Sequence, residues 1–500
     1  MNMELSSFIK INPADSVVVC LRPFKKGETI NVDGKEIEVK QDTPAGHKVL
    51  IKDTAEGGNV IKYGYPIGHA RENLTAGQWV NENNLKTNLA GTLSYEYHPV
   101  DAKLDIPVEN RTFKGYVRKN GEVGTRNEIW IVPTVGCVNG IGEQLAKRLT
   151  EETHLEGIDA VHCWHHNYGC SQLDADHENT RKVLRDICLH PNAGAVLVLS
   201  LGCENNQPEA FMELLGDYDK SRIKLLITQK VKGDELEEGM NILRQLYALA
   251  KEDRREDVPV SKLRIGLKCG GSDGFSGITA NPLVGELSDW LVAQGGTSVL
   301  TEVPEMFGAE TILMNRCKTK KLFDQTVSMI NNFKEYFLSH GEPVGENPSP
   351  GNKAGGISTL EDKALGCTQK CGKGPVSGVM EYGERIQNDG LNLLSAPGND
   401  LVAAMALAAA GCQIITFTTG RGTPFGTFVP TMKISTNNDL AERKPNWIDF
   451  NAGQLLNGKD MVSVRNAFID KVIAVASGEK ARNEINGYSE IAIFKNGVTL

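Results

Sequence analysis

The sequence lacks the features that would place it in a membrane or on a nucleic acid. No run approaches the roughly 20 consecutive apolar residues that a bilayer-spanning helix needs. Residues 1–10 have neither the basic segment nor the long apolar core of a secretory signal peptide. Blocks rich in lysine or arginine are also missing, and the formal net charge is −9. We therefore expect a cytoplasmic protein with no membrane or nucleic-acid partner.

Cysteine, by contrast, is well represented, with 11 residues. In a reducing compartment these residues are not expected to form a disulfide framework. Several follow short apolar runs that are typical of buried strands, and the carboxyl ends of parallel strands line the ligand crevice in α/β folds. These positions favour a soft-metal or redox-sensitive site. The runs at 129–133, 157–161, 195–199 and 264–268 precede, in this order, Cys137, Cys163 with Cys170, Cys203, and Cys269.

Apolar periodicity and turn residues divide the chain into four parts. Residues 1–93 alternate short apolar runs with Gly-containing turns such as that within 29–39, which predicts a small all-β domain. Residues 94–114 are polar and aperiodic, and we expect an extended linker. Strand-like and helix-like runs alternate in residues 115–255 and again in 256–500, which predicts two parallel α/β domains.

The last domain carries the loops that look most like an active site. Its predicted strands, 264–268, 297–301, 391–395 and 413–418, are followed by loops built from Gly, Asp, Glu, Thr and Arg. Residues 342–378 are rich in Gly, Pro and Lys, and the sequence predicts little secondary structure there. A segment of that length is usually a lid, a binding loop or disordered.

Imidazole and thiol groups are densest in residues 162–172, which are followed by His177. Such groups suit zinc or iron. Thiols from separate strand ends, with Asp273, would bind one metal ion or three corners of an iron–sulfur cluster. The alternative is that each cysteine packs as a small hydrophobe. Cys367 and Cys371 match no usual redox or zinc spacing, so no role is predicted for them. The predicted metal ligands are Cys170, Cys203, Cys269 and Asp273.

Basic and hydroxyl side chains of the late loops are candidates for binding an anionic, hydroxylated ligand. Arg421 lies between two glycines and is able to make a bidentate pair with a carboxylate. A solvated surface position is the alternative for each of these residues, and helix capping is the alternative for Asp273 and Glu305, which are otherwise candidate acids or metal ligands. No dinucleotide glycine fingerprint or phosphate loop is present, so NAD and ATP are disfavoured. The predicted substrate-binding residues are Thr419, Arg421, Thr423 and Lys433.

Several long phrases resemble the altronate/galactarate dehydratase family, and they run through essentially the whole chain. The resemblance implies an N-terminal β-clip (SAF-like) domain, a dimerising middle domain and a C-terminal Rossmann-like variant. It also implies an iron(II)-dependent hydro-lyase that converts D-altronate to 2-dehydro-3-deoxy-D-gluconate in galacturonate breakdown and requires reducing conditions. The phrases are Thr43–Val49, Val60–Gly68, Gly124–Asn139, Tyr168–Gln172, Gly202–Asn206, Cys269–Pro282, Asn347–Gly356 and Thr418–Pro424.

The chemistry of such a dehydration agrees with the residues present. A proton must leave C2 and hydroxide must leave C3, and a divalent metal stabilises the enolate-like charge. His166, His177 and Lys353 are the candidate general bases. Galactarate dehydration, sulfo-lyase chemistry on a related acid, and a sugar-acid sensor or scaffold without catalysis remain alternatives. Residues 369–374 and 391–400 favour the altronate branch of the family.

Overall fold

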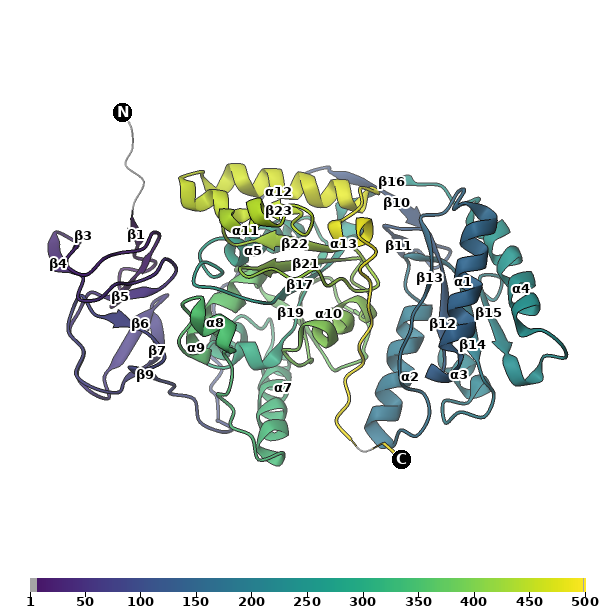
Figure 1. The fold of residues 1–500 in the computed structure, drawn as a ribbon, viewed down its shortest axis with the longest axis horizontal. Helices are drawn as coiled ribbons and strands as arrows, with labels where there is room; N and C mark the ends of the chain where they lie inside the picture. The colour runs from purple at the N-terminus through teal and green to yellow at the C-terminus, as the bar shows by residue number, and fades with distance from the viewer. Residues whose placement is uncertain (1–6, 498) are drawn as a thin grey trace.

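The computed structural model describes residues 7–497 and 499–500, arranged as three units in a row along the long axis (Figure 1). The β-rich unit at the N-terminal end lies at one side, the unit containing α1 to α4 lies at the other, and the large C-terminal unit lies between them. The C-terminal unit is therefore the one that contacts both others. Among the described residues, no helix is long and apolar enough to cross a membrane.

The N-terminal unit is all β, as the turn-rich sequence predicts. One antiparallel sheet has the order β1-β2-β5-β8, a second has the order β6-β7-β9, and β3 and β4 form a hairpin. The hairpin turns at Asp33 and Gly34, whose φ values of 52° and 79° suit an Asp-Gly turn. The strands are β1 (Phe8–Ile9), β2 (Val17–Cys20), β3 (Thr29–Val32), β4 (Lys35–Glu38), β5 (Lys48–Leu50), β6 (Asn59–Lys62), β7 (Tyr65–Ala70), β8 (Trp79–Val80) and β9 (Leu85–Lys86).

An extended segment, residues 87–111, leads from β9 to β10 (Thr112–Val117) without helix or strand. Its tyrosines hold it against the C-terminal unit. The Tyr97 hydroxyl donates to the Cys317 carbonyl at 2.5 Å, and the Tyr95 hydroxyl donates to Glu310 at 2.7 Å. β10 then pairs with β11 (Val123–Gly124) and β16 (Glu256–Pro259), so the start and the end of the middle unit are joined in one small sheet.

The middle unit contains a parallel sheet of four strands in the order β13-β12-β14-β15. One face packs against α1 and α4, and the other against α2, which in turn contacts α10 of the C-terminal unit. β13 begins at residue 160, later than predicted, so Cys163 ends this strand instead of following it. The elements are β12 (Glu128–Pro133), α1 (Asn139–Thr153), β13 (Ala160–Cys163), α2 (Asp174–Cys188), β14 (Ala193–Ser200), α3 (Pro208–Leu214), β15 (Ile223–Ile227) and α4 (Glu235–Ala250).

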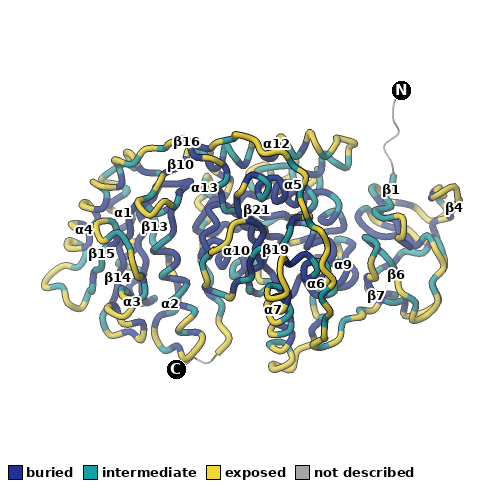
Figure 2. Tube along the Cα trace, turned by 180° about the vertical axis from the view of Figure 1, so that it is seen from behind, coloured by how far each residue is buried: buried dark blue, intermediate teal, exposed yellow. Residues whose placement is uncertain are grey.

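The C-terminal unit is built on seven parallel strands in the order β19-β20-β18-β17-β21-β22-β23. Its buried strands form the dark centre of the molecule in Figure 2. Residues of α5, α7 and α12 cover one face and those of α10 the other. The strands are β17 (Arg264–Cys269), β18 (Thr297–Leu300), β19 (Val376–Met380), β20 (Gly390–Leu394), β21 (Ile414–Thr419), β22 (Thr431–Ser435) and β23 (Phe450–Asn451); the helices are α5 (Ala280–Ala293), α6 (Glu310–Met314), α7 (Lys320–Ser339), α10 (Asp400–Ala409), α11 (Asn438–Arg443), α12 (Met461–Ala476) and α13 (Arg482–Ile485).

Residues 342–378 contain more regular structure than the sequence predicts. They form α8 (Pro350–Ala354), α9 (Leu360–Cys367) and the first residues of β19. Two caps stabilise these helices despite the Gly and Pro content. Ser349 and Asn352 make a capping box, and the Thr359 hydroxyl accepts from the backbone N–H of Asp362 at 3.2 Å.

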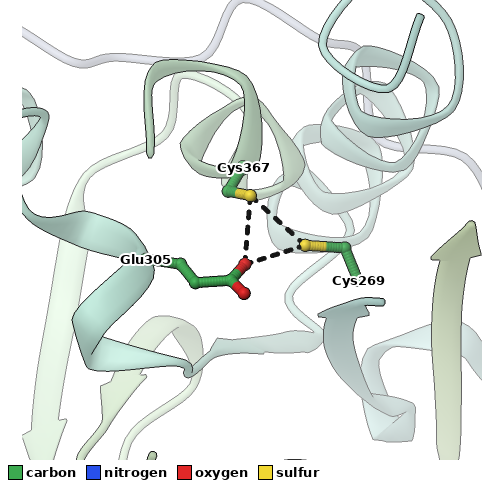
Figure 3. Close-up of side chains that lie close together, drawn as sticks. All are labelled: Cys269, Glu305 and Cys367. Carbon is green, nitrogen blue, oxygen red and sulfur yellow. Dashed lines mark hydrogen bonds between the residues drawn. The ribbon is translucent and has the colours of Figure 1, made fainter. Parts of the chain in front are cut away.

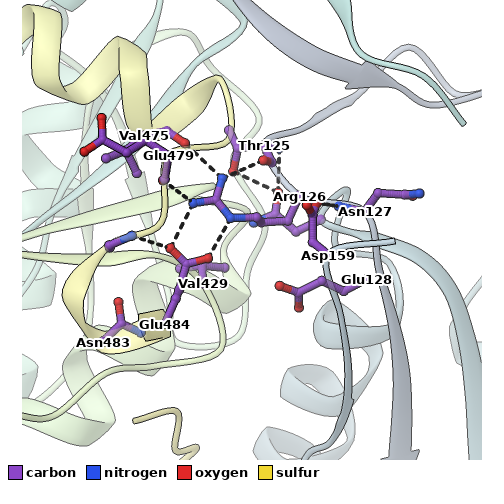
Figure 4. Close-up of polar contacts among 12 residues, drawn as sticks. Thr125, Arg126, Asn127, Glu128, Asp159, Val429, Val475, Glu479, Asn483 and Glu484 are labelled. Atoms are coloured by element: carbon purple, nitrogen blue, oxygen red, sulfur yellow. Dashed lines mark hydrogen bonds and ion pairs between the residues drawn. The ribbon is translucent and has the colours of Figure 1, made fainter. Parts of the chain in front are cut away.

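Arg126, at the start of the middle unit, joins it to the end of the C-terminal unit (Figure 4). Its guanidinium forms a bidentate pair with Glu484 at 2.6 and 2.8 Å and donates to the carbonyls of Val475 and Glu479 at 2.9 and 2.8 Å. The side chain is buried, so all of these bonds lie away from solvent. Arg126 therefore fixes the two α/β units relative to each other.

The C-terminal segment also spans the two α/β units and lies beside the middle unit in Figure 1. The Asp176 carboxylate, at the start of α2, accepts from the backbone N–H groups of Asn496 and Gly497 at 2.8 and 2.6 Å. The Leu500 N–H donates to the Ser171 carbonyl at 3.0 Å. The chain end is thereby held next to the loop that carries Cys170.

Candidate functional site

Cys269 is the last residue of β17, the central strand of the seven-stranded sheet. The chain continues to β18 on one side of β17, while β21 lies on the other side. Open parallel sheets bind ligands outside the carboxyl ends of their strands where the direction of the strand order changes. The sequence placed Cys269 at a strand end, and the sheet order shows that this end is at such a point.

Three anionic or ionisable side chains converge there (Figure 3). The Cys269 and Cys367 sulfur atoms are 3.3 Å apart, and Glu305 Oε2 lies 3.2 Å from the first and 3.1 Å from the second. All three residues are buried. They come from β17, from the turn after β18, and from the end of α9. Two thiols and a carboxylate at this spacing form a donor set for a metal ion.

Lysines surround this triad. Lys370 Nζ lies 2.7 Å from Cys269 Sγ and 2.9 Å from Glu302 Oε2, while Lys363 Nζ lies 2.8 Å from Glu305 Oε1. Burial alone would raise the pKa of Glu305, but the three neighbouring ammonium groups hold it well below its usual range. Glu305 is thus ionised. Lys268 completes the network, with Glu302 Oε1 at 2.5 Å and Asp400 Oδ1 at 2.8 Å.

Glu302 has an unusual backbone conformation. Its φ and ψ of 69° and 56° lie in the left-handed region, which is uncommon for a residue other than Gly. In this conformation its carboxylate accepts from the backbone N–H of Cys269 at 3.1 Å as well as from two lysines. Strain of this kind is typically retained where side chains must be held in one arrangement.

The structure brings several of the predicted site residues into the same region. The Cα of Gly271, two residues after Cys269, lies beside Thr419 and Arg421, because a methyl group on it would approach both side chains at 3.3 Å. Arg421 is exposed, and its guanidinium has no hydrogen-bond or ion-pair partner among the described residues. Thr423 follows in the same loop. These loop residues therefore lie close enough to Cys269 to serve one ligand.

Asp273 was predicted as a metal ligand, but its carboxylate is fully occupied by hydrogen bonds from the protein. Its two carboxylate oxygens accept from Thr436 at 2.9 Å each, from Asn437 at 3.0 Å and from Ser276 at 3.1 Å. The carboxylate also accepts from the backbone N–H of Phe275 at 3.1 Å. This saturation indicates that Asp273 holds the loops after β17 and β22 together.

Lys433 and Lys353 occupy contrasting positions in the same unit. Lys433 is buried on β22, donates to the Thr431 carbonyl at 3.0 Å and lies 5.6 Å from the centre of the Phe417 ring. Burial lowers the pKa of Lys433 to about 8. Lys353 lies on α8, half-buried, and its ammonium has no polar partner among the described residues. Of the two amines, Lys353 is the one that is available to a ligand.

The N-terminal unit contributes to this region through β6 and the residue that follows it. Tyr63, Cys367, Lys363 and Asp273 line one small cavity. A methyl group on Gly277 would lie 2.1 Å from the Tyr63 hydroxyl, so only glycine admits this ring. Tyr63 itself has a φ of 59°, again in the left-handed region. The N-terminal unit thus places one tyrosine hydroxyl in the cavity that Cys367 also lines.

The structure does not bring the predicted residues of the middle unit to this site. Cys170 and Cys203 are exposed in the middle unit, whereas Cys269 is buried in the C-terminal unit. Both ring nitrogens of His166 are engaged, Nε2 with the Pro133 carbonyl at 2.7 Å and Nδ1 with the Tyr168 N–H at 3.1 Å. Burial lowers the pKa of His166 to about 4. His177 lies on α2 in the same unit. The metal ligands and general bases predicted from the sequence are therefore divided between the middle and C-terminal units.

Sequence reasoning missed Cys367, Lys363 and Lys370. These residues lie on α9 and in the turn after it, within the segment for which little secondary structure was predicted. The spacing of Cys367 and Cys371 matches no usual redox or zinc motif, so the sequence predicts no role for them. The useful signal lies in the residues around them, since three of the eight positions 363–370 are Lys or Cys and the other five are uncharged.

Fold and site together define a three-unit enzyme with a buried thiol, carboxylate and lysine centre in a parallel α/β domain. Three family models match the chain in order. The model for the altronate/galactarate dehydratase SAF domain matches residues 6–88, that for the D-galactarate dehydratase/altronate hydrolase second domain matches 115–251, and that for the D-galactarate/altronate dehydratase C-terminal domain matches 260–499. The chain belongs to the altronate/galactarate dehydratase family.

Full-length relatives support the same assignment. The chain is 56% identical to the altronate dehydratase of Bacillus subtilis (strain 168) over 99% of its own length and 100% of that protein. It is 53% identical to the altronate dehydratase of Escherichia coli (strain K12), with the same coverage. Identity to the galactarate dehydratase (L-threo-forming) of E. coli (strain K12) is 32%, over 97% of this chain and 96% of that protein.

Proposed function

We propose that the protein is an altronate dehydratase, which converts D-altronate to 2-dehydro-3-deoxy-D-gluconate and water. The observation that carries the proposal is the buried centre of Cys269, Cys367 and Glu305 at the carboxyl end of β17, surrounded by lysines. The much higher identity to altronate dehydratases than to galactarate dehydratase supports this substrate. The sulfo-lyase and the non-catalytic alternatives are not favoured.

The donor set fits a divalent iron. Two thiols and a carboxylate combine soft and hard ligands, as suits Fe2+. Lys268, Lys363 and Lys370 balance Glu302, Glu305 and Asp400 in charge, so deprotonation of the two thiols would leave a net charge of −2, which one divalent ion neutralises. When bound, the iron would supply a Lewis acid that stabilises negative charge on the substrate carboxylate and on the leaving oxygen.

The residues of the chain supply the binding and proton-transfer steps. Arg421 and Thr419 would bind the carboxylate and hydroxyl groups of the sugar acid. Lys353, as a neutral amine, would accept the proton from C2, the C2–C3 double bond would form, and the C3 hydroxyl would leave as water with a proton from Tyr63. Burial raises the pKa of Tyr63, so its hydroxyl keeps its proton at neutral pH. The enol product then ketonises in solution or in the site.

Cellular context and assembly belong to the same proposal. We place the enzyme in the cytoplasm, where reduced thiols persist; all 11 cysteines are free in this structure. We also propose a homodimer formed through the middle unit. Light scattering of the purified chain tests the dimer, and a monomeric mass would contradict it.

The deciding assay uses reduced, iron(II)-loaded protein with D-altronate and with galactarate in separate reactions. We expect 2-keto-3-deoxy acid from altronate. Product from galactarate alone would overturn the substrate, and no product from either acid would overturn the dehydratase assignment. Cys367→Ser should abolish turnover, whereas Cys317→Ser, at another buried cysteine of the same unit, should retain it.

A further inference from the structure

Three exposed cysteines lie at neighbouring strand ends of the middle unit, well away from the site proposed above. Cys137 follows β12, Cys170 follows β13 and Cys203 follows β14. β12 is the centre of these three strands, with β13 and β14 on either side. This is the arrangement that places Cys269 at the ligand end of the larger sheet. Here, however, all three thiols are exposed, so none of them serves as a packed core residue.

Hydrogen bonds join the loops that carry these thiols. The Gly136 N–H donates to the Tyr168 carbonyl at 3.0 Å, and the Asn206 N–H donates to the Gly169 carbonyl at 2.9 Å. The Cys170 thiol itself lies 3.3 Å from Asn205 Oδ1. Each cysteine is within two residues of one of these contacts. The three loops therefore form one continuous rim.

The loop of Cys203 is further fixed by Glu204, which is buried. One of its carboxylate oxygens accepts from the hydroxyls of Ser200 at 2.5 Å and Thr134 at 2.6 Å, and the other accepts from the Gly202 N–H at 2.6 Å. Thr134 lies directly after β12, so Glu204 couples two of the three loops. Ligands that are fixed in this way before binding are typical of metal sites.

A second observation points to a missing ligand. Among the described residues, several buried polar atoms that lack a hydrogen-bond partner lie close in sequence to these thiols, although such atoms are rare in folded proteins. One such atom follows each cysteine within three residues, and a fourth belongs to His177, whose ring also bonds the backbone of Asn205. The unpartnered atoms are Asn139 Oδ1, Gln172 Nε2, Asn206 Oδ1 and His177 Nε2.

The positions of the thiols argue against a single metal ion. Among the described residues, the sulfur atoms of Cys137, Cys170 and Cys203 do not all lie within 4.8 Å of one another. Thiolates around one tetrahedral ion, with bonds of about 2.3 Å, would be about 3.8 Å apart. A cluster with several iron atoms separates its thiolates more widely, and iron–sulfur clusters are held by cysteine thiolates.

We propose that Cys137, Cys170 and Cys203 bind an iron–sulfur cluster in the middle unit, with one iron left without a cysteine ligand. The nearby amides and His177 would hydrogen-bond the cluster or the group on that open iron. This site is separate from Cys269, Cys367 and Glu305, and its existence does not depend on which sugar acid the enzyme dehydrates. The proposal concerns cluster binding and assigns it no redox step.

The test measures iron and acid-labile sulfide in anaerobically purified, reconstituted full-length protein. We expect about four sulfides per chain, with visible charge-transfer absorption and an EPR signal after reduction. Cys137→Ser, Cys170→Ser and Cys203→Ser should each lose most of the sulfide. Cys163→Ala, at a partly buried cysteine of the same unit, should keep it. Circular dichroism of each variant shows whether it is folded.

The outcomes separate this proposal from the proposed function. Cys367→Ser should lose iron but no sulfide, because its site lies in the other unit. Sulfide near zero in the wild-type protein would overturn the cluster, even if altronate is dehydrated. Sulfide that persists in all three serine variants would overturn the ligand assignment. Conversely, a cluster in a protein that fails to dehydrate altronate would support this inference and reject the substrate.

Discussion

Lys62 Nζ, on β6, lies 2.9 Å from Asp362 Oδ1, on α9, although the two residues are 300 positions apart in the chain. The other carboxylate oxygen of Asp362 accepts from Lys48 at 2.8 Å. All three side chains are almost completely buried. Asp362 is followed on the same helix by Lys363 and Cys367. The N-terminal unit therefore holds in place α9, the helix that carries Cys367, one of the two thiols of the site.

Asp362→Asn should weaken the attachment of the N-terminal unit. Burial alone would raise the pKa of Asp362, but Lys48 and Lys62 hold it well below its usual range, so the carboxylate is ionised. Its removal leaves two buried ammonium groups uncompensated, at a cost of about 3–5 kcal/mol. We expect faster proteolysis within residues 87–111 and a lower unfolding temperature.

The matched control is Asp42→Asn, which removes an exposed partner of Lys25 in the same unit. Exposed ion pairs contribute little, so the proteolysis rate should not change. Equal proteolysis of the Asp362→Asn variant and the wild-type protein would show that the buried pair does not hold the N-terminal unit.

Tyr63→Phe should lower kcat by a factor of about 10² or more with little change in KM, since proton transfer by a positioned group is typically worth this much. The substitution removes the hydroxyl but leaves the ring carbon Cζ packed against Gly277, so the unfolding temperature should change little. Tyr65→Phe, in the same hairpin, is the control because Tyr65 is 45% exposed. Activity of Tyr63→Phe within threefold of the wild type would exclude Tyr63 as the proton donor.

Arg126→Lys should destabilise the contact between the two α/β units. Lysine keeps the charge but cannot form the bidentate pair with Glu484 or reach the carbonyls of Val475 and Glu479 together. We expect a loss of about 3 kcal/mol in the free energy of unfolding, measured by chemical denaturation. Arg244→Lys alters a bidentate but exposed pair with Glu152 and should be nearly neutral. Similar midpoints for both variants would contradict this role of Arg126.

The sequence was most informative about strands, which it marks by short apolar or alternating runs between turn residues. It predicted the all-β N-terminal unit, the strands of the middle sheet, and β17, β18, β20 and β21 of the C-terminal sheet, because apolar runs between turn residues specify buried strands locally. It did not identify β19, β22 or β23. It also identified strand ends as the functional positions, and Cys269 lies at one. The regular structure of α9 was missed: its N-cap at Thr359 is a local signal, but its burial against β7 depends on contacts with a distant segment.

The grouping of site residues was much less predictable. Which strand ends meet depends on sheet order, and the sequence does not reveal that Cys170 and Cys203 belong to one sheet while Cys269 belongs to another. Glu302 and Glu305 approach Cys269 only because β18 lies next to β17. Tyr63 reaches the site only because the N-terminal unit docks on α9. These are contacts between distant segments, which local sequence patterns do not encode.

Lys433→Met should stabilise the protein at neutral pH. Burial lowers the pKa of Lys433 from 10.5 to about 8, so the unfolded chain binds this proton more tightly than the folded protein does. Below pH 8 both states are protonated and the folded state carries the full penalty, about 3 kcal/mol at 1.36 kcal/mol per pKa unit. Methionine has a similar shape and no charge. The free energy of unfolding at pH 7 should therefore increase.

The pH dependence gives the sharper comparison. Between pH 8 and 10.5 the folded protein has released the proton and the unfolded chain has not, so the stability that Lys433 contributes rises with pH. The difference between wild type and Lys433→Met should therefore shrink across this range, whereas Lys459→Met, at an exposed lysine, should show no difference at any pH. A constant difference from pH 7 to 10.5 would show that Lys433 stays protonated in the folded protein throughout this range, which would contradict a pKa that burial lowers.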